Sequence, residues 1–227
     1  MKWRLQKEIE KLKKKILSLG AMVEERVRMA IQALEERDRD LAKKVIESDR
    51  EIDAFEVEME EDCLKVLALY QPVAVDLRFI SAMIKINNDL ERIGDEAVNI
   101  AERVETMTKR KPSEVPFDFN IMAEKTEAML KSSLDAMVNL DVDLAYKICL
   151  LDDEVDEMNR VIYDKIKAAI NREHGNTGYF INLFLVSRHL ERIADHATNI
   201  AEDVIYMIEG KISRHRKNEP NPGMSKQ

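Results

Sequence analysis

The chain has 227 residues, which is enough for one large domain or two small ones with a buried core. Charged residues make up 35% of it and aromatic residues only 5%, and six glycines and five prolines are few, so the composition favours long helices over sheets. The net charge of −8 argues against nucleic acid as a partner, because phosphate binding needs a basic surface. No run of about 18 apolar residues is present, so no membrane-spanning helix is expected, and the charged first residues lack the apolar core of a secretory signal.

Apolar residues recur at helical spacing along most of the chain. In chain order, the predicted helices cover about 4–37, 40–70, 75–108, 117–139, 141–173 and 178–209. Pro72 ends the second helix, and the stretch 109–116, which contains lysines and prolines, is expected to be a linker. The polar stretch 211–227 is expected to form a flexible tail.

The sequence contains an internal repeat. Residues 90–102 return at 190–202 with ten of the thirteen positions identical, and residues 49–53 resemble residues 152–156. Each half is therefore a three-helix unit, and short connections make neighbouring helices antiparallel. We expect an all-α fold in which two three-helix bundles, six long helices in total, pack around a pseudo-twofold axis. The expected division is a first repeat, a second repeat and a polar tail, at 1–111, 112–210 and 211–227.

Both copies of the repeated segment align acidic and amide side chains on one helix face, opposite an apolar stripe. Stacked oxygen ligands without a Lys or Arg among them are what a hard metal ion requires. A solvated face is the ordinary alternative for a single copy, but its recurrence favours a binding site. The residues concerned are Glu91, Asp95 and Asn99 in the first copy and Glu191, Asp195 and Asn199 in the second.

A second set of acids lies on the middle helix of each repeat. Asp49 and Asp53 are one turn apart at the edge of an apolar face, and Asp152 with Asp156 repeats this spacing. Helix capping or surface charge is the alternative for either pair alone. If the acid face of the third helix turns toward this edge, the carboxylates converge. Converging carboxylates need bound cations, protonation or basic neighbours.

Other catalytic patterns are missing from the sequence. None of the four histidines completes the Glu-x-x-His motif of di-iron bundles, and there is neither a glycine-rich phosphate loop nor a nucleophile elbow. The histidines are expected to be surface or structural residues, although His189 and His196 could reach an ion near Asp195. Cys63 and Cys149 fit buried thiols better than a disulfide.

These tandem repeats, each with D-x-x-x-D on its second helix and E-R-I-x-D-x-A-x-N-I-A-E on its third, resemble the PhoU family. Residues 71–78 also resemble that family's turn into the third helix, and the resemblance covers about residues 5–209. It implies a cytoplasmic, typically dimeric regulator of high-affinity phosphate transport. Such a regulator couples the ATPase subunit of the phosphate ABC transporter to a sensor histidine kinase, represses signalling when phosphate is plentiful, and meets the membrane only through these partners.

The resemblance further implies metal ions at the acid pairs, as multinuclear iron or as Zn, Mn or Mg. Carried over to this sequence, the ligands are Asp49, Asp53, Glu91, Asp95, Asp152, Asp156, Glu191 and Asp195, with Asn99 and Asn199 as additions. The stretch 174–178 replaces the Gln-Pro turn in the second repeat, so partner contacts made by that turn are not implied there. Beside a non-enzymatic regulator, the residues leave open a carboxylate-bridged metalloenzyme and a metal-free interaction scaffold.

Overall fold

The computed structural model describes residues 2–110, 113 and 117–210, which form an all-helical protein. The expected tail 211–227 and part of the expected linker lie outside the described residues. Within the described ranges no helix is long and apolar enough to cross a membrane. The helices are α1 Lys2–Glu36, α2 Arg39–Glu47, α3 Asp49–Tyr70, α4 Ala74–Thr108, α5 Asn120–Asn139, α6 Val142–Arg172 and α7 Thr177–Glu209, with a short 3₁₀ helix at His174–Asn176.

The predicted helices are present, but the one expected to run continuously over 40–70 is divided at Ser48 into α2 and α3. The Ser48 hydroxyl donates to the Val45 carbonyl at 2.7 Å, and its backbone N–H is shared between the carbonyls of Lys44 and Val45. The prediction of one continuous helix was wrong here, because apolar residues keep helical spacing on both sides of Ser48 and their pattern does not reveal the break. Asp38 caps α2 by accepting hydrogen bonds from the N–H groups of Asp40 and Leu41.

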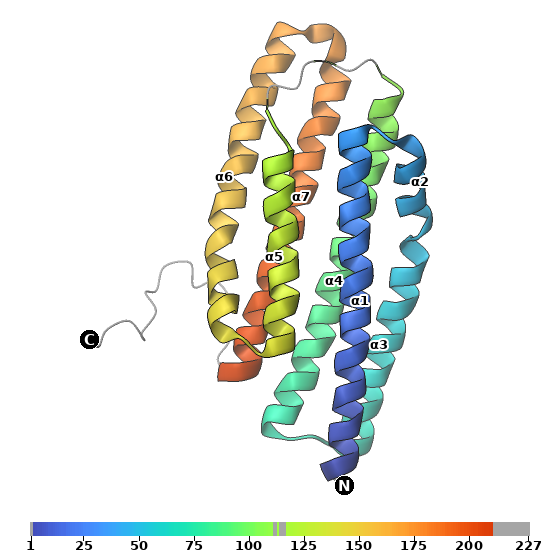
Figure 1. Cartoon of the computed structure of the whole chain (residues 1–227), viewed down its shortest axis with the longest axis vertical. Coiled ribbons are helices and arrows are strands. Elements are labelled where there is room, and N and C mark those ends of the chain that lie inside the picture. The colour runs from blue at the N-terminus through green and yellow to red at the C-terminus, as the bar shows by residue number, and fades with distance from the viewer. Residues whose placement is uncertain (1, 111–112, 114–116, 211–227) are drawn as a thin grey trace, which may run out of the picture.

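The two repeats form two bundles that lie side by side (Figure 1). Helices α1, α2, α3 and α4 pack together in the first bundle, and α5, α6 and α7 in the second. The antiparallel helices α4 and α7 make the most extensive contact between elements, and they join the bundles along the middle of the molecule. The third helices of the two repeats therefore face each other, as a pseudo-twofold arrangement requires.

The apolar stripe predicted for the third helix of each repeat is the core. Ile86, Leu90, Ile93 and Ile100 of α4 are fully buried, and so are the corresponding residues of α7. At Gly94 of α4 an added Cβ would lie 3.1 Å from Cδ1 of Ile52 on α3. In the second repeat, Val155 takes the place of Ile52 and Ala194 takes the place of Gly94. A smaller residue on the middle helix therefore accompanies a larger one on the third helix. Cys63 and Cys149 are free thiols, and burial raises the pKa of each to about 12.

Candidate metal centre

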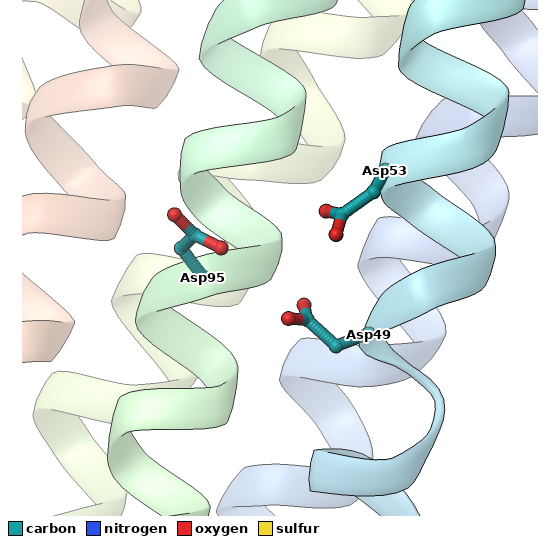
Figure 2. Close-up of side chains that lie close together, drawn as sticks. All are labelled: Asp49, Asp53 and Asp95. Carbon is teal, nitrogen blue, oxygen red and sulfur yellow. The ribbon is translucent and has the colours of Figure 1, made fainter.

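The first acid cluster lies between α3 and α4. Asp49 and Asp53 stand one turn apart on α3, and Asp95 approaches them from α4 (Figure 2). One carboxylate oxygen from each of the three residues lies within 4.8 Å of the other two. At Asp95, the acid face of α4 therefore turns toward the edge of the middle helix, which is the condition under which the carboxylates converge.

The second acid cluster repeats this geometry between α6 and α7. Asp152 and Asp156 of α6 meet Asp195 of α7, again with ligand oxygens within 4.8 Å of one another. Asp152 is buried, and the Thr198 hydroxyl donates to its Oδ1 at 3.4 Å. Among the described residues, each repeat thus brings together one Asp pair and one Asp from its third helix.

Crowding and burial make both clusters unfavourable for three negative charges. Burial, followed by the charges of Asp53 and Asp95, raises the pKa of Asp49, while nearby Arg26 opposes this shift. Burial and then Asp53 raise the pKa of Asp95. The pKa of Asp195 is raised to about 6 by burial and then by the charges of Asp152, Glu191 and Asp156. A bound cation would relieve this repulsion.

The ligand chemistry at the first cluster fits a hard cation. In the described part of the chain, Oδ1 of Asp49 is buried and has no hydrogen-bond partner. Buried acceptors are almost always satisfied, so this oxygen needs a donor or an ion. Three carboxylates without a thiolate or imidazole suit Mg, Mn or Fe better than Zn, which favours nitrogen and sulfur ligands.

Four further predicted ligands lie outside these two groups of three. Burial and then the charges of Asp95, Glu56 and Asp53 raise the pKa of Glu91. Glu191 pairs with Arg188 of its own helix, with oxygen–nitrogen distances of 2.5 and 2.6 Å. The amides of the two asparagines donate elsewhere, from Asn99 to Glu96 at 3.4 Å and from Asn199 to Asp89 at 3.2 Å. The role of these four residues as ligands stays a prediction.

A polar cleft of about 890 Å³ lies between the two clusters. Asp95 of the first cluster lines it from one side, and Asp152 and Asp195 of the second line it from the other. Arg92 and Arg192, at equivalent positions of the two repeats, also line the cleft. An ion held in either cluster would therefore lie beside the same cleft.

Beside this cleft, acidic side chains of α4 pair with histidine and arginine side chains of α7. Glu96 of α4 pairs with His189 at 2.6 Å and with Arg192 at 3.0 Å, and Asp89 of α4 pairs with His196 at 2.8 Å. Burial would raise the pKa of Glu96, but the hydrogen bonds from His189 and Arg192 outweigh it and hold the pKa below its usual value.

Positions 89 and 96 correspond to 189 and 196 in the second repeat, so the contacts are reciprocal and locate the pseudo-twofold axis between them. Both histidines have structural roles here, as expected. Their partners, Glu96 and Asp89, could not be predicted from the helical pattern, because these pairs join different helices. The signal that was available is the change from Glu96 to His196 inside an otherwise similar segment.

A duplicated three-helix bundle with one carboxylate cluster per repeat defines this protein's class. A family model described as the PhoU domain matches residues 16–104 and again 119–204. The chain belongs to the PhoU family.

Its relatives and similar solved structures span nearly the whole chain. It is 38% identical to the phosphate-specific transport system accessory protein PhoU homolog of Aquifex aeolicus, over 94% of this chain and 96% of that protein. It is 35% identical to the protein of the same name in Clostridium acetobutylicum, over 90% and 94%. A similar solved structure is PhoU from Pseudomonas aeruginosa, with a TM-score of 0.87 and 34% sequence identity, covering 91% of this chain and 99% of that one. Another is the phosphate transport system regulatory protein PhoU from Streptococcus pneumoniae, with a TM-score of 0.85 and 27% sequence identity, covering 92% of this chain and 98% of that one.

Proposed function

We propose that this protein is an accessory regulator of a phosphate-specific transport system, and not an enzyme. The observation that carries the proposal is the match over nearly the full length of relatives with that name. In this role the protein, a cytoplasmic homodimer, couples the ATPase subunit of a phosphate ABC transporter to a sensor histidine kinase. It represses the kinase when phosphate is plentiful.

Each acid cluster, in this proposal, holds metal ions, as multinuclear iron or as Mn, Mg or Zn. Support comes from the converging carboxylates and from the unpartnered buried oxygen of Asp49. Asp49 and Asp53 would hold an ion from α3 while Asp95 holds it from α4, so that the ion ties two helices of one bundle together. The second cluster ties α6 to α7 in the same way. Because α4 and α7 pack against each other, the ions would set the shape of the surface that partner proteins bind.

The regulatory role is tested by deleting the gene in its host and following a phosphate-starvation reporter at high phosphate. Deletion is expected to leave the reporter on, and the wild-type gene to restore repression. A variant with Asp53→Ala and Asp95→Ala is expected to fail in restoring it. The matched control is Glu60→Gln with Glu61→Gln, which removes two acids from the exposed side of the same helix, α3.

Binding to the transporter is tested by co-purification with its ATPase subunit. Capture of that subunit by the wild-type protein and by the control variant supports the proposal. A reporter that stays repressed after deletion, together with no capture of the ATPase subunit, contradicts it.

A further inference from the structure

One end of the first bundle exposes large apolar side chains. Among the described residues, the three most exposed large hydrophobic side chains are Trp3, Leu69 and Val73, each 75% exposed, and Val75 is 60% exposed. They come from the first turn of α1, the last turn of α3 and the start of α4. These segments meet at the lower end of the molecule's long axis, beside the N-terminus in Figure 1. We call these four residues the apolar tip.

Side-chain contacts show that the beginnings of α1 and α4 lie next to each other. The Gln6 amide of α1 donates to Asp76 of α4 at 3.3 Å. About two turns further along α1, the Lys13 ammonium lies 5.3 Å from the ring centroid of Phe79. Gln71 ends α3 in a left-handed conformation, with φ of 47°, and turns the chain directly into α4. The apolar tip is therefore one surface made by three chain segments.

Basic residues lie beside Trp3 at the start of α1, although the whole chain is acidic. Residues 3–15 contain six Lys or Arg residues against two Glu, in a chain with a net charge of −8. Lys11, Lys13 and Lys15 pair with acids, so the basic residues that matter for this surface are Arg4 and Lys7. Arg4 and Lys7 are exposed, and the Lys7 ammonium lies 5.9 Å from the centroid of the Trp3 ring. Basic side chains beside exposed apolar ones are typical of proteins that bind acidic lipid surfaces.

We propose that the apolar tip docks on an acidic membrane surface. Trp3, Val73 and Val75 enter the headgroup region, while Arg4 and Lys7 face anionic lipids. Trp3 is the only tryptophan of the chain, and tryptophan favours the boundary between lipid and water. Charge complementarity favours an anionic surface, and side chains exposed on the end of a long bundle are free to enter a lipid layer without any change of fold.

The corresponding turn of the second repeat differs in kind. There the Asn176 amide donates to Glu173 at 2.6 Å and to Ser113 at 2.5 Å, so polar bonds replace the exposed valines. Only the first repeat would therefore touch lipid. Asp95 follows Val75 by 20 residues on α4, which places the first acid cluster about 30 Å above the membrane at 1.5 Å per helical residue.

The test uses the full chain and lipid vesicles, with Trp3 as its own reporter. Vesicles of phosphatidylcholine mixed with phosphatidylglycerol are expected to shift the tryptophan emission to the blue and to carry the protein upward in a flotation gradient. Vesicles of phosphatidylcholine alone are expected to do neither. Brominated lipids are expected to quench the emission, because the ring lies within the headgroup region.

Two variants separate the apolar and the electrostatic contribution. Val73→Asp with Val75→Asp is expected to weaken vesicle binding by at least about tenfold, and Arg4→Gln with Lys7→Gln by about tenfold on anionic vesicles. The matched control is Ile121→Asp with Leu150→Asp, which changes two exposed apolar residues of the second bundle and should leave binding unchanged. Circular dichroism establishes that all three variants are folded.

Three results would overturn the proposal: no binding to anionic vesicles, equal binding to neutral ones, or an equal loss in the control variant. If the wild-type protein does not bind vesicles and a tip variant no longer captures the transporter's ATPase subunit, the surface would be assigned to a protein partner instead. None of these results depends on metal content or on repression, so the proposed function is tested separately.

Discussion

The two repeats build the same acid cluster in different surroundings. In the first, Asp53 and Asp95 are exposed and Arg26 lies near Asp49. In the second, Asp152 is buried and Asp195 is exposed as Asp95 is, but the pKa of Asp195 is raised to about 6. Duplication has kept the three carboxylates, while their neighbours have diverged. The comparison shows that the spacing of the carboxylates sets where they converge, whereas burial and nearby charge set how strongly their pKa values are raised.

Removal of bound metal should have the largest effect. A ligand present at about a thousand times its Kd stabilises the folded state by about 4 kcal/mol per site. Stripping both clusters with a chelator is therefore expected to lower the Tm by more than about 10 °C. Asp53→Ala with Asp95→Ala should show about half of that chelator effect. A Tm that does not respond to chelator in the wild-type protein would contradict the prediction.

The packing difference between the repeats predicts the next largest effect. Gly94→Ala places a Cβ 3.1 Å from Cδ1 of Ile52 and is expected to lower the free energy of unfolding by about 1–2 kcal/mol. Combining it with Ile52→Val copies the Val155 and Ala194 pair of the second repeat. The free energy of unfolding of the double variant should therefore exceed the value expected from adding the two single effects by about 1 kcal/mol. Urea denaturation of the four proteins measures this coupling, and strictly additive effects would refute the packing explanation.

The raised pKa of Asp195 predicts a smaller effect that depends on pH. A carboxyl whose pKa is about 6 in the folded protein and 3.8 in the unfolded chain contributes its full stability below pH 3.8, and this contribution is lost as the pH rises through about 6. Asp195→Asn should therefore raise the Tm of metal-free protein at pH 7 by about 2–4 °C, or about 1 kcal/mol after allowance for solvent screening, and by less at pH 5. Melting curves at the two pH values check this, and an equal gain at both would show that the charge is not the cause.

The crossed ion pair predicts the smallest effect. Arg192 pairs with Glu96, whereas the equivalent position opposite Arg92 is occupied by His196. Arg192→Gln is expected to cost about 0.5–1 kcal/mol, because the arginine is largely exposed, and Arg92→Gln should cost less. Chemical denaturation of both variants, at low and high salt, measures the difference. An equal cost for the two arginines would indicate that the pair with Glu96 adds nothing.

Much of this architecture could be predicted from the sequence because it depends on local periodicity and duplication. Apolar spacing gave the helices, and the 100-residue repeat placed Asp95 and Asp195 in equivalent roles. The break at Ser48 was missed because apolar residues keep helical spacing on both sides of it. The pairing of Glu96 with His189 was missed because it depends on how two helices pack. The cleft has the same origin, since it exists only where α4 meets α7.

The measurement that tests the central claim most directly is the metal content of the purified protein. The protein is prepared without chelator or nickel resin, and mass spectrometry quantifies its metals. Its two single-cluster variants are Asp53→Ala with Asp95→Ala, and Asp156→Ala with Asp195→Ala. Each variant is expected to retain about half of the metal of the wild-type protein, because each repeat encodes its own site. Unchanged metal in both variants, or a wild-type protein that binds none even when titrated with Fe, Mn, Zn and Mg, would contradict the claim that the acid clusters are metal sites.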